Sequence, residues 1–569
     1  MPPAPPVPSP ASRSRAALWV AVALPLLAAF APRDLWAPDE PRYGLVARTI
    51  LETGDALVPR IDGQPYAEKP PLVFATMAAL GAVTGGVTAV VARLACALFA
   101  AVAILTTARL ARRWFGDAGL GDTAALLCST TGLVLWNGSR AGLDLPMTCF
   151  ALLALEAGTV LVARRSLGAA CAFGAALGAG LLVKGPHVFY VPVAALAGGA
   201  LASGQGRRLR DPRWLLGLVV ALCVAAAWYF PARAHAGSAP SYNSDLSFGE
   251  RVLGQLGSRA TGEDEPHAHG PLYLLPLLLG FGLPWTPAWL LGLVRGARPS
   301  RVPEADRFGV GAAVWGLLAP LVLLSVPTSK RELYLVPLFP CAALLAAWAL
   351  HRCTGPRAAT HLVRGFVAVG AGLAVAAVAA PWVAPLLAAR FDADDRPAVA
   401  HVGSAGVVTA LAAATVLAAA GALAARRLRD RPAGAARATG LALAATGLVF
   451  ATAVLPAFDR WKSFDAAAAA GAAARPDAAL AIWGFSDRSV LWWFPHRRLE
   501  HLGVHTYDRA AAALAPDAPP VLVLAKAKNH RERVRRATPA DRAVLDRARV
   551  VWEGPVGGTT YVLLTNGDA

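Results

Sequence analysis

Fourteen long apolar runs divide this 569-residue sequence, and each approaches the length that an α-helix needs to cross a lipid bilayer. The hydrocarbon core of a bilayer is about 30 Å thick, which takes roughly 20 helical residues. Hydrophobic residues make up 56% of the chain and charged residues only 16%, a balance that excludes a soluble enzyme. We therefore predict an α-helical polytopic membrane protein. The runs lie near residues 17–32, 71–86, 88–108, 121–138, 144–163, 167–183, 187–203, 214–231, 271–294, 309–327, 333–351, 363–388, 404–425 and 437–456.

The basic residues give an independent count of the spans. A formal charge of +18 would suit a nucleic-acid partner, but Lys and Arg gather in short segments beside the apolar runs. Such segments collect on the cytoplasmic side, so the chain crosses the membrane an even number of times between two of them. Each interval holds two runs except the first, which holds three. The basic clusters lie at residues 13–15, 109–113, 164–165, 207–213, 295–307, 352–364 and 426–437.

The weakest run in that first interval is 71–86, because it opens with prolines and is broken by glycines. We assign it as a juxtamembrane helix in the plane of the membrane, which leaves about 13 transmembrane helices. The run 17–32 could be a signal peptide, but it continues into Arg33 and a polar loop, so a retained span is favoured. An odd count from a cytoplasmic N-terminus places the C-terminus outside a bacterial inner membrane.

Three regions follow from this count. Residues 1–15 are predicted to be a disordered cytoplasmic N-terminus, residues 16–456 the transmembrane domain, and residues 457–569 a small external α/β domain. The first external loop spans 33–87, and a large external loop spans 232–270. In the C-terminal region, helical stretches alternate with short apolar strand candidates, which lie at 479–483, 521–524, 550–552 and 560–564.

Polar residues concentrate in the predicted external segments. The first loop carries two adjacent carboxylates with an arginine, and then a Glu-Lys pair before a di-proline. In a generic loop, such charges would only pair with one another in solvent. Other external segments, however, add charged and hydrogen-bonding side chains on the same side of the membrane: Asp144, Lys184, Arg259, His267, His269, Lys330 and Tyr334.

These outer cations suggest a bound anion. Basic residues on the outer face are not needed to orient the chain, and cations near lipid usually face a cavity or a partner. A phosphate at the interface is a ligand that such residues bind. The span interiors hold almost no ionisable residues apart from Arg93 and Glu156, whereas ion-coupled transporters place acidic residues near the midplane. The composition of the spans therefore disfavours a transporter.

The first loop resembles that of a known enzyme family. Its segments Asp39-Glu40-Pro41-Arg42-Tyr43 and Glu68-Lys69-Pro70-Pro71-Leu72 are similar to the first loop of the aminoarabinose transferases that modify lipid A. These belong to the GT-C glycosyltransferases that use polyprenyl-phosphate sugars, a group that includes the protein O-mannosyltransferases. Later segments agree in order, among them Lys184-Gly185-Pro186 and Ser329-Lys330. The resemblance covers residues 16–456 and implies a GT-C fold with about 13 spans and an external C-terminal α/β domain.

The resemblance also implies roles for individual residues. It marks Asp39 as an acidic residue that takes the acceptor proton or orients the acceptor, and Asp144 as a second acidic residue of the cavity. Together with the adjacent Glu40, the candidate catalytic residues are Asp39, Glu40 and Asp144. The candidate ligands of the donor phosphate are Arg42, Lys69, Arg259, Tyr334 and Lys330, the last from its place in an external segment.

A divalent metal, whether zinc, magnesium or manganese, is a further expectation from the resemblance. Glu68 matches a residue associated with a bound metal in a family member. Where the family often has a His-Glu pair before the loop arginine, this chain has Gly254 and Gln255. His267 and His269 are then the candidate replacement ligands.

The predicted function is an inverting glycosyl transfer at the outer face of the inner membrane. The sugar, aminoarabinose or another pentose or hexose, would leave a polyprenyl-phosphate donor for a lipid A-like, glycan or protein acceptor. Because a lipid phosphate is the leaving group, no nucleotide site is needed, and no P-loop or dinucleotide motif is present. The alternatives are a protein O-mannosyltransferase-like enzyme and, from another class, a flippase or transporter of lipid-linked sugars. The expected partners are the donor, the acceptor and the bilayer, without nucleic acid.

Overall fold

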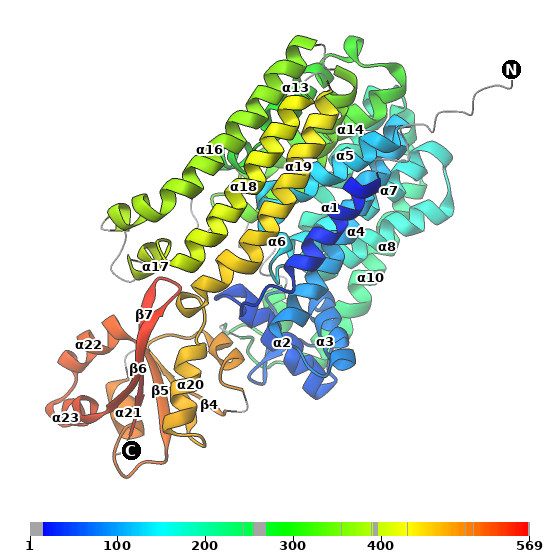
Figure 1. Ribbon diagram of the computed structural model, residues 1–569. Helices are drawn as coiled ribbons and strands as arrows, with labels where there is room; N and C mark the ends of the chain where they lie inside the picture. Colours follow the sequence, from blue (N-terminus) through cyan, green and yellow to red (C-terminus); the bar gives the residue numbers. More distant parts are fainter. Residues whose placement is uncertain are drawn as a thin grey trace, which may run out of the picture.

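A bundle of long helices carries a small mixed sheet at one end (Figure 1). The computed structural model describes residues 15–566 except 243, 253, 255–268, 354–355, 389, 391–395, 429–430, 496 and 504–505. Residues 1–14 and the candidates Arg259 and His267 thus lie outside the described residues.

Nine described helices are long and apolar enough to cross a membrane, and eleven if two bent pairs are counted as one span each. The chain is thus a multi-pass membrane protein. The nine are α4 (Ala89–Phe115), α7 (Asp144–Arg164), α8 (Leu167–Lys184), α10 (Arg213–Ala236), η5 with α14 (Glu304–Ser325), η6 through η7 (Glu332–Cys353), most of α16 (Thr360–Ala388), α18 (Ala405–Arg427) and α19 with its C-terminal turns (Pro432–Trp461).

The two bent pairs correct the prediction of straight spans at 121–138 and 271–294. Helices α5 (Ala118–Ser129) and α6 (Gly132–Gly138) meet at 72°, and α12 (Leu274–Phe281) and α13 (Thr286–Gly296) at 115°. Between α12 and α13 lies Pro284, a residue type whose ring and missing N–H kink or break a helix. Apolar composition gives no information about such a bend.

Shorter apolar helices complete the bundle. Helix α1 (Arg15–Ala28) opens the described chain, and η2 with α9 (Pro186–Ala202) packs on α14. Helix α3 (Leu72–Thr84) has 13 residues, about 20 Å at 1.5 Å per residue. Its assignment as a juxtamembrane helix stays a prediction.

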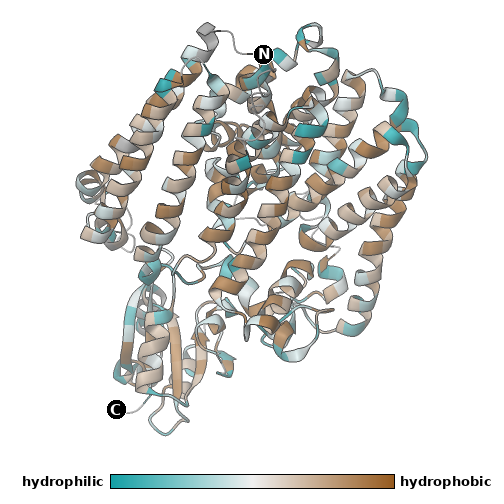
Figure 2. Cartoon of the chain, turned by 45° about the vertical axis from the view of Figure 1, so that its right-hand side comes forward, coloured by the Kyte–Doolittle hydropathy of each residue, from teal (hydrophilic) through white to brown (hydrophobic). Residues whose placement is uncertain are grey.

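Hydrophobic residues predominate along the helices of the bundle (Figure 2). Leu215 in α10, Trp382 and Leu386 in α16, and Val416 in α18 are each more than 60% exposed. An exposed apolar surface of this size marks a protein that faces lipid.

The first loop contains α2 (Asp39–Thr53) and the short strands β1 (Arg60–Ile61) and β2 (Gln64–Pro65). It is tied to the bundle by Arg93 of α4, a fully buried residue whose guanidinium donates hydrogen bonds to the carbonyls of Ala29, Ala31 and Arg33 at 2.8–3.1 Å. These carbonyls follow the last turn of α1, where the helix no longer supplies N–H donors for them. The ionisable Arg93 noted within a predicted span therefore has a structural partner set.

The C-terminal region contains a five-stranded mixed sheet in the order β4-β3-β5-β7-β6. β3 is parallel to β4 and β5, whereas β7 is antiparallel to β5 and β6. The β6–β7 hairpin turns at Gly557 and Gly558, which have φ of 61° and 78°, a conformation that favours glycine. The strands are β3 (Ala479–Trp483), β4 (Leu499–His501), β5 (Val521–Lys526), β6 (Arg549–Val556) and β7 (Thr559–Thr565), with helices α20 (Asp465–Ala474), α21 (Tyr507–Ala513), α22 (Ala527–Arg536) and α23 (Pro539–Arg547).

Candidate functional site

A cavity of about 410 Å³ lies where the first loop meets α8, α10 and the segment before α15. Its volume is in the range of sites for small molecules. Most of the wall is apolar or aromatic, including Leu181, Trp228 and Leu324. Polar side chains enter from three separate segments: Glu68 and Lys69 from the first loop, Lys184 and His187 from the α8–η2 junction, and Ser329 and Tyr334 from the chain before α15.

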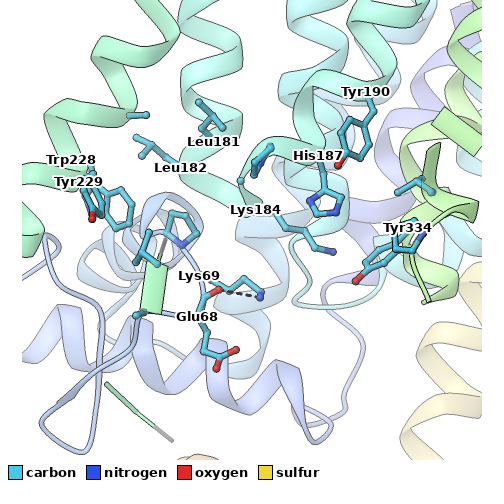
Figure 3. A pocket seen from close by; sticks show the side chains of 18 of the residues that line it. Glu68, Lys69, Leu181, Leu182, Lys184, His187, Tyr190, Trp228, Tyr229 and Tyr334 are labelled. Atoms are coloured by element: carbon cyan, nitrogen blue, oxygen red, sulfur yellow. Dashed lines mark hydrogen bonds between the residues drawn. The ribbon is translucent and has the colours of Figure 1, made fainter. Parts of the chain in front are cut away.

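Two lysines bring positive charge to this cavity from different segments (Figure 3). Lys184, the last residue of α8, lies 5.4 Å from the centre of the Tyr334 ring and forms an ion pair with Asp144 at 2.5 Å. Lys69 donates a hydrogen bond to the backbone carbonyl of Glu68 at 3.1 Å. Because the wall is mostly apolar, the electrostatic attraction between these lysines and a bound anion is stronger than it would be in water.

Asp144 lies beside the cavity. It begins α7 and is buried, with 5% of its side chain exposed. A second, smaller cavity is lined by Asp144 and shares Lys184, His187 and Tyr334 with the first. Asp144 is therefore paired with Lys184, which lines the larger cavity, and itself lines the smaller cavity beside it.

Asp39 begins α2 and keeps 26% of its side chain exposed. Its carboxylate lies 3.7 Å from Arg42 and 3.4 Å from Arg331. Burial raises the pKa of the Tyr43 hydroxyl well above its usual value, and the charges of Asp39 and Asp144 add to this rise. Although burial acts to lower the pKa of Arg331, the same two carboxylates raise it. Asp39 and Asp144 thus belong to one charged cluster.

Glu40 occupies a different environment from its neighbour. It is 1% exposed, pairs with Arg33 at 3.0 Å and Arg140 at 3.5 Å, and accepts hydrogen bonds from the backbone N–H groups of Trp36 and Ala141. Burial acts to raise its pKa, but Arg33 and Arg140 outweigh it and hold the pKa at about 2. A carboxylate with this many fixed partners joins α2 to the bundle, so we reassign Glu40 from catalysis to structure.

Lys330 also differs from its predicted role. The residue is 2% exposed, and its ammonium group donates hydrogen bonds to the backbone carbonyls of His269 and Pro327. It is not among the residues that line either cavity described above. Its neighbour Arg331 contacts Asp39 instead, which makes Arg331 the cation of this segment that belongs to the charged cluster.

The described residues do not assemble the expected metal site. Glu68 pairs with Arg251 at 3.0 Å, and His269 stacks on Tyr273 with ring centres 3.8 Å apart. Within the described parts of the chain, no group of three or more His, Cys, Asp or Glu side chains is placed to hold a metal ion. We assign no step to a metal.

Sequence reasoning did not select Arg331, His187 and Tyr190. His187 and Tyr190 line both cavities, and the His187 ring lies 5.2 Å from that of Tyr190 and 5.6 Å from that of Tyr334. Their position at the outer ends of apolar runs, close to other candidate site residues, is the sequence feature that could have identified them.

Comparisons with known proteins show what this chain is similar to. A family profile described as dolichyl-phosphate-mannose-protein mannosyltransferase matches residues 68–230. An undecaprenyl phosphate-alpha-4-amino-4-deoxy-L-arabinose arabinosyl transferase of Pseudomonas fluorescens (strain Pf0-1) is 30% identical over 331 residues, which are 57% of this chain and 54% of that protein. A transferase of the same description from Pseudomonas aeruginosa (strain UCBPP-PA14) is 29% identical over 371 residues, 64% of each chain. This chain therefore spans between half and two thirds of these relatives.

A solved structure extends the likeness over the whole chain. The crystal structure of ArnT from Cupriavidus metallidurans bound to undecaprenyl phosphate superposes with a TM-score of 0.75 at 21% identity, covering 98% of this chain and 97% of that one. The fold is thus that of a GT-C protein. The resemblance first seen in residues 39–43 and 68–72 is confirmed.

Proposed function

We propose that this chain, a GT-C protein similar to the aminoarabinose transferases, is an inverting glycosyltransferase that uses a polyprenyl-phosphate sugar at the outer face of the inner membrane. The observation that carries the proposal is the division of the cavity between the cations of Lys69 and Lys184 and walls that are mostly apolar. A polyprenyl-phosphate sugar has the same division, with an anionic phosphate between an apolar tail and a polar sugar. The cavity therefore suits this class of donor.

The proposed step is a single displacement at the anomeric carbon of the sugar. The bond from this carbon to the phosphate oxygen breaks while a bond to the acceptor oxygen forms, so the configuration inverts. Negative charge grows on the departing polyprenyl phosphate, and Lys69, Lys184 and Arg42 stabilise it as preorganised cations in a partly dry site. Asp39 takes the proton of a hydroxyl acceptor, or orients an acceptor phosphate that is already ionised.

The substrates follow from the relatives. Their names give 4-amino-4-deoxy-L-arabinose on undecaprenyl phosphate as the donor, and the family resemblance gives lipid A as the acceptor. The mannosyltransferase profile over residues 68–230 favours, as a second candidate, transfer of a hexose to a protein hydroxyl. Both candidates need the same site.

One assay separates these functions from transport. The purified full chain is incubated with radiolabelled undecaprenyl-phosphate aminoarabinose or polyprenyl-phosphate mannose, and with lipid A or a hydroxyl-bearing peptide, and the products are identified by mass spectrometry. Covalent transfer to lipid A supports the first candidate, and transfer to the peptide supports the second. Translocation of the donor across vesicles without transfer would replace both with a flippase.

We further propose 13 spans. Adding α1 and η2 with α9 to the eleven candidates gives this number, with α3 in the membrane plane, the N-terminus in the cytoplasm and residues 457–569 outside. The expected result is that alkaline phosphatase fused after Ala569 is active, whereas a green fluorescent protein fused there stays dark. Fluorescence without phosphatase activity would contradict the topology, and fusions in the basic segment 207–213 serve as the cytoplasmic control.

Replacing Lys69 with Ala is expected to weaken donor binding. The change removes one of the two lysines that line the cavity and leaves the rest of the wall unchanged, so the KM for the donor should rise roughly tenfold to a hundredfold, since a hydrogen bond to a charged group contributes about 1.5–3 kcal/mol. Inhibition by added undecaprenyl phosphate should weaken by a similar factor. Lys528→Ala, at an exposed position of α22, is the matched control, and equal KM values in the two variants would remove Lys69 from the site.

A further inference from the structure

The C-terminal domain touches the first loop directly. Its segment before and within η10 (Arg488–Trp492) lies against α2, where the guanidinium of Arg48 is 4.2 Å from the centre of the Trp492 ring and donates to the Trp492 carbonyl at 3.2 Å. A Cβ at Gly44 would come within 2.8 Å of the Trp492 ring, so only glycine allows this close approach. Arg488 adds an ion pair to Asp62 at 2.6 Å.

Asp487 occupies the centre of this contact. One carboxylate oxygen lies 3.4 Å from Arg42. The other accepts hydrogen bonds from the Tyr242 hydroxyl at 3.3 Å and from the backbone N–H of Ser489 at 3.0 Å. Tyr242 is 2% exposed, and its backbone N–H donates to the Pro65 carbonyl at 2.8 Å. The carboxylate is thus fixed from three segments of the chain.

Arg42 lies between two carboxylates from different domains. Asp39 is 3.7 Å away on one side, and Asp487 is 3.4 Å away on the other. Only 20% of the Arg42 side chain is exposed, so its guanidinium has little access to partners in solvent. The carboxylates of Asp487 and Asp39 therefore both attract the Arg42 guanidinium.

We propose that Asp487 is a positioning residue, through which the C-terminal domain holds Arg42 away from Asp39. This inference rests on the proposed function, in which Arg42 faces the leaving phosphate and Asp39 faces the acceptor. Without Asp487, the Arg42 guanidinium closes onto Asp39 as a tight ion pair. This ion pair occupies the carboxylate that acts as the base, and it also withdraws the Arg42 cation from the leaving phosphate. The C-terminal domain thus completes the site without contacting the reacting atoms.

The test compares Asp487→Asn with Glu500→Gln in the purified full chain. Glu500 is a matched control because it also pairs with an arginine, Arg509 at 3.8 Å, in the same domain, and its side chain is 57% exposed. We expect Asp487→Asn to lower kcat about tenfold and to raise the KM for the donor, because the guanidinium that closes onto Asp39 is withdrawn from the donor phosphate. Glu500→Gln should keep both constants within twofold of the unmodified protein.

A double-mutant cycle then tells positioning from a general structural effect. In an Arg42→Gln background, Asp487→Asn should change kcat less than twofold, because its effect passes through Arg42. An equal loss of kcat in both backgrounds, or a kcat like that of Glu500→Gln, would overturn the proposal.

Tyr242→Phe, which removes only the hydroxyl that holds Asp487, provides a second test if Asp487→Asn does not accumulate. This variant is expected to lower kcat about threefold, and an unchanged kcat would contradict the proposal. If the unmodified chain neither transfers sugar nor binds undecaprenyl phosphate, the proposed function itself has failed.

Discussion

Replacing Asp39 with Asn is expected to reduce glycosyl transfer roughly a thousandfold, within the range that a positioned general base contributes. The amide cannot take the proton of a hydroxyl acceptor, and it no longer balances the charge of Arg42 and Arg331. Stability should change little, because the side chain is partly exposed and its ion pairs are 3.4 Å or longer, a class of contact worth about 1 kcal/mol or less.

Initial rates of the purified variant, together with its thermal unfolding temperature, measure the two effects separately. Glu52→Gln is the control, because Glu52 is exposed near the end of the same helix α2. If Asp39→Asn transfers sugar as fast as Glu52→Gln does, Asp39 has no part in the chemistry. A loss of both activity and folded protein would instead make Asp39 a structural residue.

Replacing Glu40 with Ala is expected to destabilise the protein by roughly 3–5 kcal/mol, the cost of breaking a buried ion pair by removing one partner. The substitution leaves Arg33, whose side chain is fully buried, without its carboxylate, and it removes the acceptor of the Trp36 and Ala141 N–H groups. Unfolding in detergent with increasing denaturant would measure the loss. A stability equal to that of Glu52→Gln would contradict the structural role.

The stability due to Glu40 should also depend on pH in one direction. Its pKa falls from an ordinary value of 4.5 to about 2 in the folded protein, so its contribution is complete above pH 4.5 and is lost as the pH falls through 2. Glu40→Gln, which does not titrate, should therefore lose less stability than the unmodified protein between pH 5 and pH 3.

Much of this architecture could be predicted from two patterns in the sequence. Apolar runs located the long helices, and the polar first loop located Asp39 and Lys69. The bends at residues 130–131 and 282–285 could not be predicted from apolar composition, because a run of apolar residues has the same composition in a straight helix and in two short ones. The second bend has a local signal in the sequence, Pro284. The contact between Asp487 and Arg42 joins residues 445 apart, and no local pattern marks it.

The contacts of Glu40 and Lys330 differ from their predicted roles for a common physical reason. Asp39 and Glu40 are successive residues of one helix, so their side chains point about 100° apart, and only one of them faces the charged cluster. Lys330 and Arg331 are successive residues where the backbone at Arg331 is extended, with φ −124° and ψ 145°, and extended neighbours point to opposite sides. The sequence therefore indicates which segments contribute to the charged cluster, and the backbone geometry decides which residue of each segment does so.

The hydrogen bonds of Arg93 to the carbonyls of Ala29, Ala31 and Arg33 bear on how such enzymes can be recombined. Engineers often exchange external loops between homologous proteins to move substrate preference. Here the start of the loop is held by an arginine some 60 residues further along the chain, within α4. If this loop is moved into a relative whose α4 has no arginine at this position, the start of the loop loses these hydrogen bonds and is no longer anchored to the bundle. The exchangeable unit therefore extends from α1 through α4.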